Sequence, residues 1–219
     1  ALAFDTPDGL HWPAADLSFQ HQVAQAPRPA RSELKASAVD LLVLARLAKH
    51  LPLADDLRLA LLTHAPKGQL RDLEASWQGA LGAPSGYAAK GQLKQLALSA
   101  AAPAPGAPGL AWPLPGLQGA TVEVELNQAG GQANLRLEDG AIELPGALAE
   151  PRVPLAQLLA EVRWQIAGER LSVQLPKLSF SNADLQGEAQ IKWETPAGAR
   201  RAGEAQSPGL LDLQATLSR

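Results

Sequence analysis

The chain has 219 residues, of which 19 are basic and 22 acidic, so its formal net charge is −3, and it contains no cysteine. This balance lacks the basic excess that binding to a phosphate backbone demands, which argues against nucleic acid as a partner. Without cysteine, disulfide frameworks and zinc–thiolate sites are excluded. Apolar residues make up 46% of the chain but aromatic residues only 4%, so the interior must be built mainly from Leu, Ala and Val.

The N-terminal part, residues 1–31, is predicted to be a β-hairpin followed by a linker. Residues 1–24 contain short extended segments in which apolar side chains are separated by one residue, as in Leu17 and Phe19, and the sequence TPDG provides a turn. Residues 25–31, QAPRPAR, are broken by two prolines and predict the linker.

A helical hairpin is predicted over residues 32–66. From Ser37 on, the sequence SAVDLLVLARLAKHL places its apolar residues near helical spacing, and Ser37 can cap the start of the helix. A second helix is predicted over residues 54–64, ADDLRLALLTH, because its aspartates favour the N-terminal end of a helix and Pro66 stops the run.

The remainder, residues 67–219, alternates apolar and polar residues with a period of two, as strands with one apolar face do. The sequence DG at residues 139–140 predicts a hairpin turn, and AGE at residues 167–169 predicts another. The strands are predicted at residues 121–127, 133–139, 161–166, 170–175, 185–193 and 211–217. The fold class is therefore mainly β and antiparallel, with a helical hairpin (α+β).

Two stretches interrupt this pattern. Residues 101–116 are rich in Pro, Gly and Ala and predict a surface loop or a joint between the halves of the chain. Residues 195–208 contain turn residues and few large apolar ones, which predicts a flexible loop.

One phrase occurs twice, as KGQLRDL at residues 67–73 and as KGQLKQL at residues 90–96. A glycine at the entry of a strand permits a bulge or a close approach of two backbones, and the leucines that follow are predicted to face one side. The repeat indicates either a recurrent way to begin a strand in any antiparallel sheet or a β-repeat architecture that grows by adding similar strands.

Longer phrases resemble a known family. The sequences APKGQLRDLEASW, LPGALAEPRVPL, FSNADLQGEAQIKW and PGLLDLQATLSR are similar to the periplasmic portion of AsmA-like proteins, specifically the YhdP branch. The resemblance covers residues 40–219.

The resemblance implies a twisted, groove-like sheet that is one segment of an extended β-repeat bridge. Such proteins are anchored in the inner membrane of Gram-negative bacteria by a helix that is not in this chain, and their periplasmic groove carries phospholipid toward the outer membrane. The expected partners are phospholipid, neighbouring segments of the same longer chain, and inner- or outer-membrane proteins. The absence of an initiator Met also suggests a piece of a longer protein.

The alternating strands supply an apolar face that could hold acyl chains if the sheet curls into an open trough. The candidate groove residues are Val122, Val124, Leu126, Leu135, Leu137, Ile142, Leu144, Val162, Trp164, Ile166, Leu171, Val173 and Leu175. The alternative is that the same face packs into a closed core, in which case the chain is a scaffolding module of the cell envelope without a ligand.

No catalytic residue, metal site or cofactor is predicted, so the chain is not expected to be an enzyme. The histidines lack the spacing of metal ligands. They are His11, His21, His50 and His64. The neighbouring carboxylates at residues 55–56 and 138–139 fit a helix start and a turn. Among the tryptophans, Trp164 and Trp193 are either core residues or part of a ligand path, and Trp112 is the better candidate for an exposed contact.

Overall fold

The computed structural model describes residues 2–5, 11–27, 29–48, 55–80, 83–101, 115–146, 150–195 and 209–218. The N-terminal hairpin pairs β1 (Leu2–Asp5) with β2 (His11–Ala15) in a small sheet of its own. The predicted joint at residues 101–116 and loop at residues 195–208 lie almost entirely outside the described residues.

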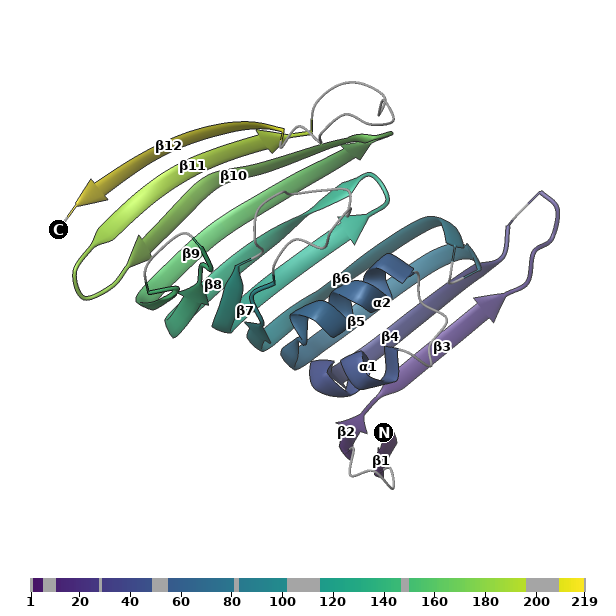
Figure 1. Cartoon of the computed structure of the whole chain (residues 1–219). Helices are drawn as coiled ribbons and strands as arrows, with labels where there is room; N and C mark the ends of the chain where they lie inside the picture. The colour runs from purple at the N-terminus through teal and green to yellow at the C-terminus, as the bar shows by residue number, and fades with distance from the viewer. Residues whose placement is uncertain are drawn as a thin grey trace.

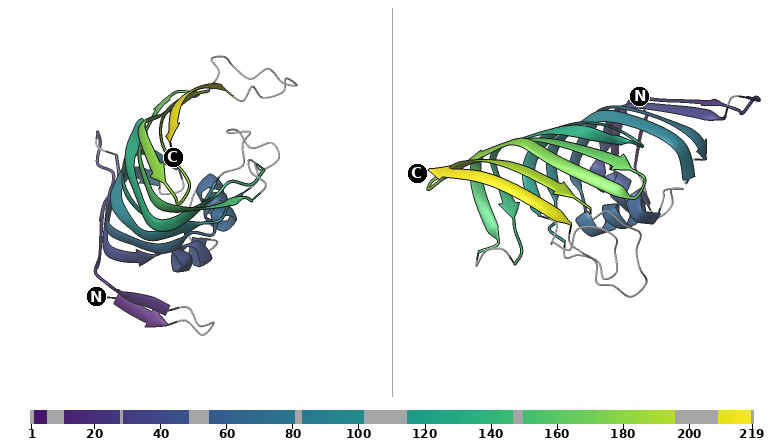
Figure 2. Two further views of the ribbon diagram at one scale, coloured as in Figure 1. Left: turned by 90° about the vertical axis from the view of Figure 1, so that its left-hand side faces the viewer. Right: turned by 90° about the horizontal axis from the view of Figure 1, so that it is seen from above.

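The main sheet contains ten antiparallel strands in the order of the sequence, from β3 at one edge to β12 at the other (Figure 1). Its strands are β3 (Leu17–Gln22), β4 (Arg31–Asp40), β5 (Lys67–Ala80), β6 (Ala83–Leu98), β7 (Gly116–Asn127), β8 (Gly130–Glu143), β9 (Arg152–Ala167), β10 (Arg170–Ser181), β11 (Gln186–Glu194) and β12 (Leu210–Ser218). Figure 2 shows that the sheet bends into a trough, with both helices on its concave side. The predicted antiparallel, groove-like fold is confirmed.

The first predicted helix starts too early. Residues 31–40 form β4, which pairs with β5 as far as Asp40, and α1 (Leu41–Leu47) begins only after that pairing ends. Asp40 rather than Ser37 caps the helix, because its carboxylate accepts a hydrogen bond of 3.0 Å from the backbone N–H of Val43. The first part of the helical hairpin predicted over residues 32–66, up to Asp40, therefore belongs to the sheet.

The second predicted helix is found almost where it was expected, as α2 (Asp55–His64). It leads into β5, so both helices form a connection between two adjacent strands of the sheet. Among the described residues, neither helix has the length and apolar character of a membrane span.

The hairpin turn predicted at residues 139–140 is wrong. Strand β8 continues through Asp139 to Glu143, and β7 and β8 are joined instead by the turn that follows Asn127. Asp139 adopts a positive φ of 50°, so the sequence DG forms an irregularity within the strand. The turn predicted at residues 167–169 is confirmed between β9 and β10.

The repeated phrase marks a bulge in two adjacent strands. In a regular strand, residues three apart point to opposite faces. The register shifts between Arg71 and Glu74 in β5 and between Leu93 and Leu96 in β6. Asp72 and Gln95, at the same place in the two phrases, adopt φ values of 51° and 52°. The extra residue lets both leucines of each phrase face one side, as predicted, because a bulge places two residues opposite one.

The same spacing of three recurs along the sheet. It separates apolar residues at Leu117/Ala120 in β7, Leu155/Leu158 in β9 and Leu175/Leu178 in β10. Gly119, with a φ of 85°, lies within the first of these intervals, and the register of β10 shifts within the last. Bulges bend a strand and increase its twist, so irregularities in successive strands account for the curvature of the trough.

The bulge at Gln95 gives a prediction for stability. Replacing Gln95 with Val is expected to lower the free energy of unfolding by about 1–2 kcal/mol, because a β-branched residue is strained at a φ of 52°. Urea unfolding followed by tryptophan fluorescence measures the effect. Lys94→Val, at the preceding strand position, is the control, and equal stability of the two variants would show that the bulge is not strained.

Candidate functional site: the concave face of the sheet

One row of apolar side chains crosses nine strands of the sheet. Cross-strand partners in an antiparallel sheet lie on the same face, so the pairing register identifies the row. Its members are Val39, Leu70, Leu93, Val122, Leu135, Ala160, Leu178, Ala189 and Ala215. Helix α1 contacts this face through Leu41 and Leu44. We call the face that carries this row the concave face.

The opposite, convex face is polar. A row of neighbouring strand positions there consists of Lys35, Glu74, Lys90, Glu125, Gln132, Arg163, Gln174, Lys192 and Asp212. Glu74 accepts ion pairs from the Nζ atoms of Lys35 at 3.8 Å and Lys90 at 3.4 Å. Such exposed pairs contribute about 0–1 kcal/mol each, so this face is suited to contact with water.

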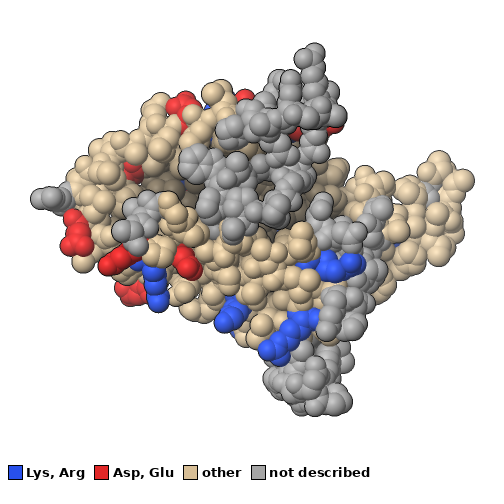
Figure 3. All heavy atoms as spheres, viewed as in Figure 1, with Lys and Arg blue, Asp and Glu red and all other residues tan. Residues whose placement is uncertain are grey.

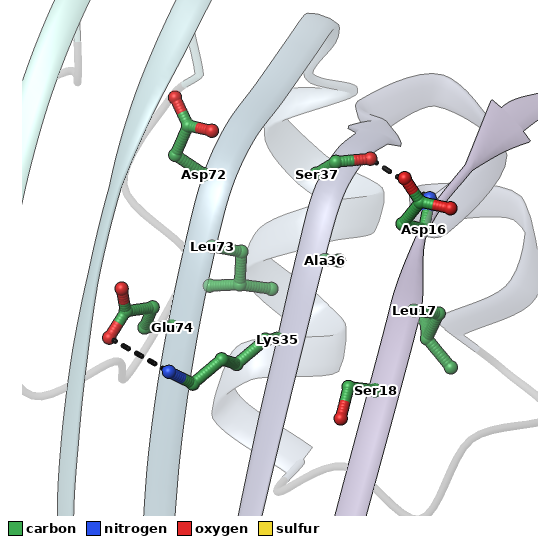
Figure 4. A pocket seen from close by; sticks show the side chains of 9 residues that line it. All are labelled: Asp16, Leu17, Ser18, Lys35, Ala36, Ser37, Asp72, Leu73 and Glu74. Carbon is green, nitrogen blue, oxygen red and sulfur yellow. Dashed lines mark hydrogen bonds and ion pairs between the residues drawn. The ribbon is translucent and has the colours of Figure 1, made fainter. Parts of the chain in front are cut away.

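A hollow of about 590 Å³ lies where β3, β4 and β5 meet (Figure 4). Carboxylates line it at Asp16, Asp72 and Glu74, and Glu74 is paired with Lys35. The hydroxyl of Ser37 accepts a hydrogen bond of 2.9 Å from the backbone N–H of Asp16. Leu17, Ala36 and Leu73 also line the hollow, but its three carboxylates make it less suited to an acyl chain than the concave face, which is therefore the candidate site.

The sequence identified the concave face correctly in β7 to β10. Twelve of the thirteen candidate groove residues lie in these strands at positions of that face. The exception is Leu144, which follows the end of β8 and whose backbone N–H donates a hydrogen bond of 2.7 Å to the carbonyl of Pro151. The pairing brings the others together, as in Leu135 with Val122 and Trp164 with Val173. Their role as a lipid groove stays a prediction.

The concave face is packed in one part and exposed in another. Val122 is 8% exposed and Leu137 is completely buried, and both belong to the core cluster that includes Leu41 of α1. In β12, by contrast, Leu211 and Leu213 are 50% and 56% exposed. Apolar side chains are therefore accessible on this face near the β12 edge. Figure 3 shows that the visible part of the concave side carries few charged side chains away from its margins.

Two tryptophan rings lie against glycine backbones on this face. Trp164 lies opposite Gly131, and a Cβ atom added to Gly131 would lie 2.5 Å from the ring atom Cζ2 of Trp164. A Cβ atom on Gly209 would likewise lie 2.7 Å from Nε1 of Trp193. Each ring thus covers a glycine backbone, an arrangement that stabilises glycine-containing strands. Both tryptophans belong to the concave face, as their strand positions predicted.

Sequence reasoning missed the concave residues of the outer strands. They include Leu34 of β4, Trp77 of β5, Ile191 of β11 and Leu213 of β12. Alternation of apolar and polar residues was a sufficient signal in β11 and β12. In β4 the alternation is broken, because Ala36 and Val39 are three residues apart, and the segment therefore resembles the start of a helix.

The titratable residues form no evident reaction centre in the part of the chain that the structure describes. Nδ1 of His21 lies 2.9 Å from the hydroxyl of Ser32, and no group of three His, Asp or Glu residues within the described ranges could hold a metal ion. His50 and Trp112 lie outside these ranges. The expectation that the chain is not an enzyme stays a prediction.

Comparison with known proteins identifies the family. No curated protein and no solved structure matches the chain. A family model described as YhdP protein matches residues 1–219, which confirms the resemblance indicated by phrases such as FSNADLQGEAQIKW. The chain therefore belongs to the YhdP family, and this membership suggests a role in lipid or cell-envelope transport.

Proposed function

We propose that the chain is a periplasmic segment of a membrane-anchored protein that carries phospholipid between the inner and outer membranes. The acyl chains lie on the concave face and the headgroups remain in water. The observation that carries this proposal is the apolar row across nine strands, together with the exposed Leu211 and Leu213 that lie beside its end at Ala215 in β12. Membership of the YhdP family supports the same role.

Burial of an acyl chain on the apolar surface can supply enough binding free energy for such a role. Removing a methylene from water is worth about 0.8 kcal/mol, so burial of about ten methylenes contributes about 8 kcal/mol. That value corresponds to a dissociation constant of about 1 μM before the costs of ordering are subtracted. A single acyl chain can therefore be held reversibly.

Native mass spectrometry of the purified chain, with lipid extraction and no added detergent, tests the proposal. We expect phospholipid to co-purify in a defined stoichiometry and labelled phospholipid to be taken up from vesicles. A stable, lipid-free chain that also takes up no labelled phospholipid would contradict the proposal.

The second candidate is a scaffolding module of the cell envelope with a closed core. The burial of Val122 and Leu137 against the cluster that contains α1 favours it for one part of the concave face. The exposed leucines of β12 do not favour it. The lipid-free outcome of the same measurement would select this candidate.

A further inference from the structure

We infer that α1 is a side wall of the lipid path, which confines acyl chains on β5 to β7 to a lane over Ala75, Ala89 and Leu126. This inference rests on the proposed function and adds the position of the lipid to it. It follows from how unevenly the concave face of these strands is covered.

The end of these strands nearest α1 is filled by protein. Leu41 and Val43 of α1 are each 5% exposed. Val39 of β4 and Leu96 of β6, on the concave face beneath the helix, are also each 5% exposed. Residues of α1 and of the floor belong to common core clusters. An acyl chain cannot occupy this space unless α1 leaves it.

The other end of the same strands is partly open. Ala75, Ala89 and Leu126 are cross-strand partners in one row, and all three are only partly buried. The alanines project less than the leucines under α1, so the floor is lower there. The row continues across the whole sheet, from Phe19 and Leu34 through these three residues to Gly131, Trp164, Val173, Trp193 and Leu211. The lane therefore joins the exposed part of the concave face near β12.

Aromatic residues border the lane on the side away from α1. Trp77 and its cross-strand partner Tyr87 lie two positions beyond Ala75 and Ala89. The ring of Phe19, which is the partner of Leu34 at the β3 end of the row, stacks on Trp77 with the centroids 6.1 Å apart. Phe19 is 56% exposed and Tyr87 is 38% exposed. Tryptophan and tyrosine favour the boundary between acyl chains and headgroups, because their rings combine apolar and polar parts. The lipid headgroup is thus expected on this side, with the acyl chain between the aromatic residues and α1.

Photo-crosslinking with a phospholipid that carries a diazirine in its acyl chain tests the lane. In the unmodified chain, we expect adducts on Ala75, Ala89 and Leu126 and on strands β9 to β12, and none on Val39 or Leu96, which are each 5% exposed. Ala89→Phe, which fills the lane, is expected to reduce adducts on β5 to β7 at least tenfold and to leave those on β9 to β12.

The adjacent residue provides a matched control. Ala88 lies on the convex face as the cross-strand partner of Ser76, so Ala88→Phe adds the same ring outside the lane and should leave the adducts unchanged. A second pair, Ala75→Leu and Ser76→Leu, repeats the comparison with a smaller side chain, and circular dichroism verifies that each variant is folded.

The outcomes separate this inference from the proposed function. Adducts on Val39 or Leu96 at the level of the lane residues would show that α1 is not a wall, although lipid binds. Equal effects of Ala89→Phe and Ala88→Phe would also overturn the lane. A complete absence of adducts from the folded chain would instead contradict the proposed function.

Discussion

Replacing Leu137 with alanine is expected to lower the free energy of unfolding by about 2–5 kcal/mol. Leu137 is completely buried and is the largest such side chain in the described part of the structure. It lies between Ala120 of β7 and Leu158 of β9 as their cross-strand partner, so truncation would leave a cavity in the core cluster. Urea unfolding followed by tryptophan fluorescence measures the loss.

Leu213→Ala is the matched control, because it removes the same atoms from a leucine that is 56% exposed. We expect Leu213→Ala to lower the free energy of unfolding by less than about 1 kcal/mol, since the atoms that it removes bury little apolar surface in the folded chain. If Leu137→Ala were no more destabilising than Leu213→Ala, the concave face would be open at Leu137 as well. The comparison therefore measures where the core ends and the accessible surface begins.

The strands could be predicted where the period of two is regular. The hairpin of β9 and β10 follows from alternation and from the short polar sequence AGE between the strands. The errors arise where the period breaks. Ala36 and Val39 of β4 are three residues apart and are both buried in the cluster with Val43 of α1. This spacing is that of a helix, so a strand that runs directly into a helix was interpreted as helical throughout.

The turn wrongly predicted at residues 139–140 has a related cause. Asp-Gly favours positive φ, which serves a hairpin turn and a bulge equally well. Asp139 does adopt a positive φ, but the strand continues because β9 pairs with Gly140 and the residues beyond it. Only the partner strand decides between the two, and that partner is not visible in the local sequence.

Which face of the sheet carries the candidate site could be predicted from the sequence, but which part of that face is accessible could not. Alternation placed Val122 and Val173 on the same side of the sheet, because the side-chain period of a strand is two. It could not show that Val122 is packed in the cluster that contains Leu41, since that contact depends on the path of a helix from another part of the chain. Accessibility is a tertiary property, and here it divides one apolar face into core and candidate groove.

Leu213→Glu is expected to weaken phospholipid binding about tenfold while leaving the chain folded. Leu213 is on the concave face as the partner of Ile191, and its 56% exposure means that a carboxylate there can remain in water when no lipid is bound. An acyl chain on the concave face would have to desolvate this carboxylate or lie away from it. The lost contact of about two methylenes corresponds to about 1.6 kcal/mol, or roughly tenfold in affinity.

Gln214→Glu is the matched control, because it adds the same charge at the next residue, on the convex face, where its partner is Gln190. Titration of labelled phospholipid into both variants and into the unmodified chain measures the affinities, and circular dichroism verifies the folds. A loss confined to Leu213→Glu places the acyl chain on the concave side of β12. Equal losses would mean that the added charge repels the lipid headgroup from either face, and no loss in either variant would mean that lipid does not reach β12.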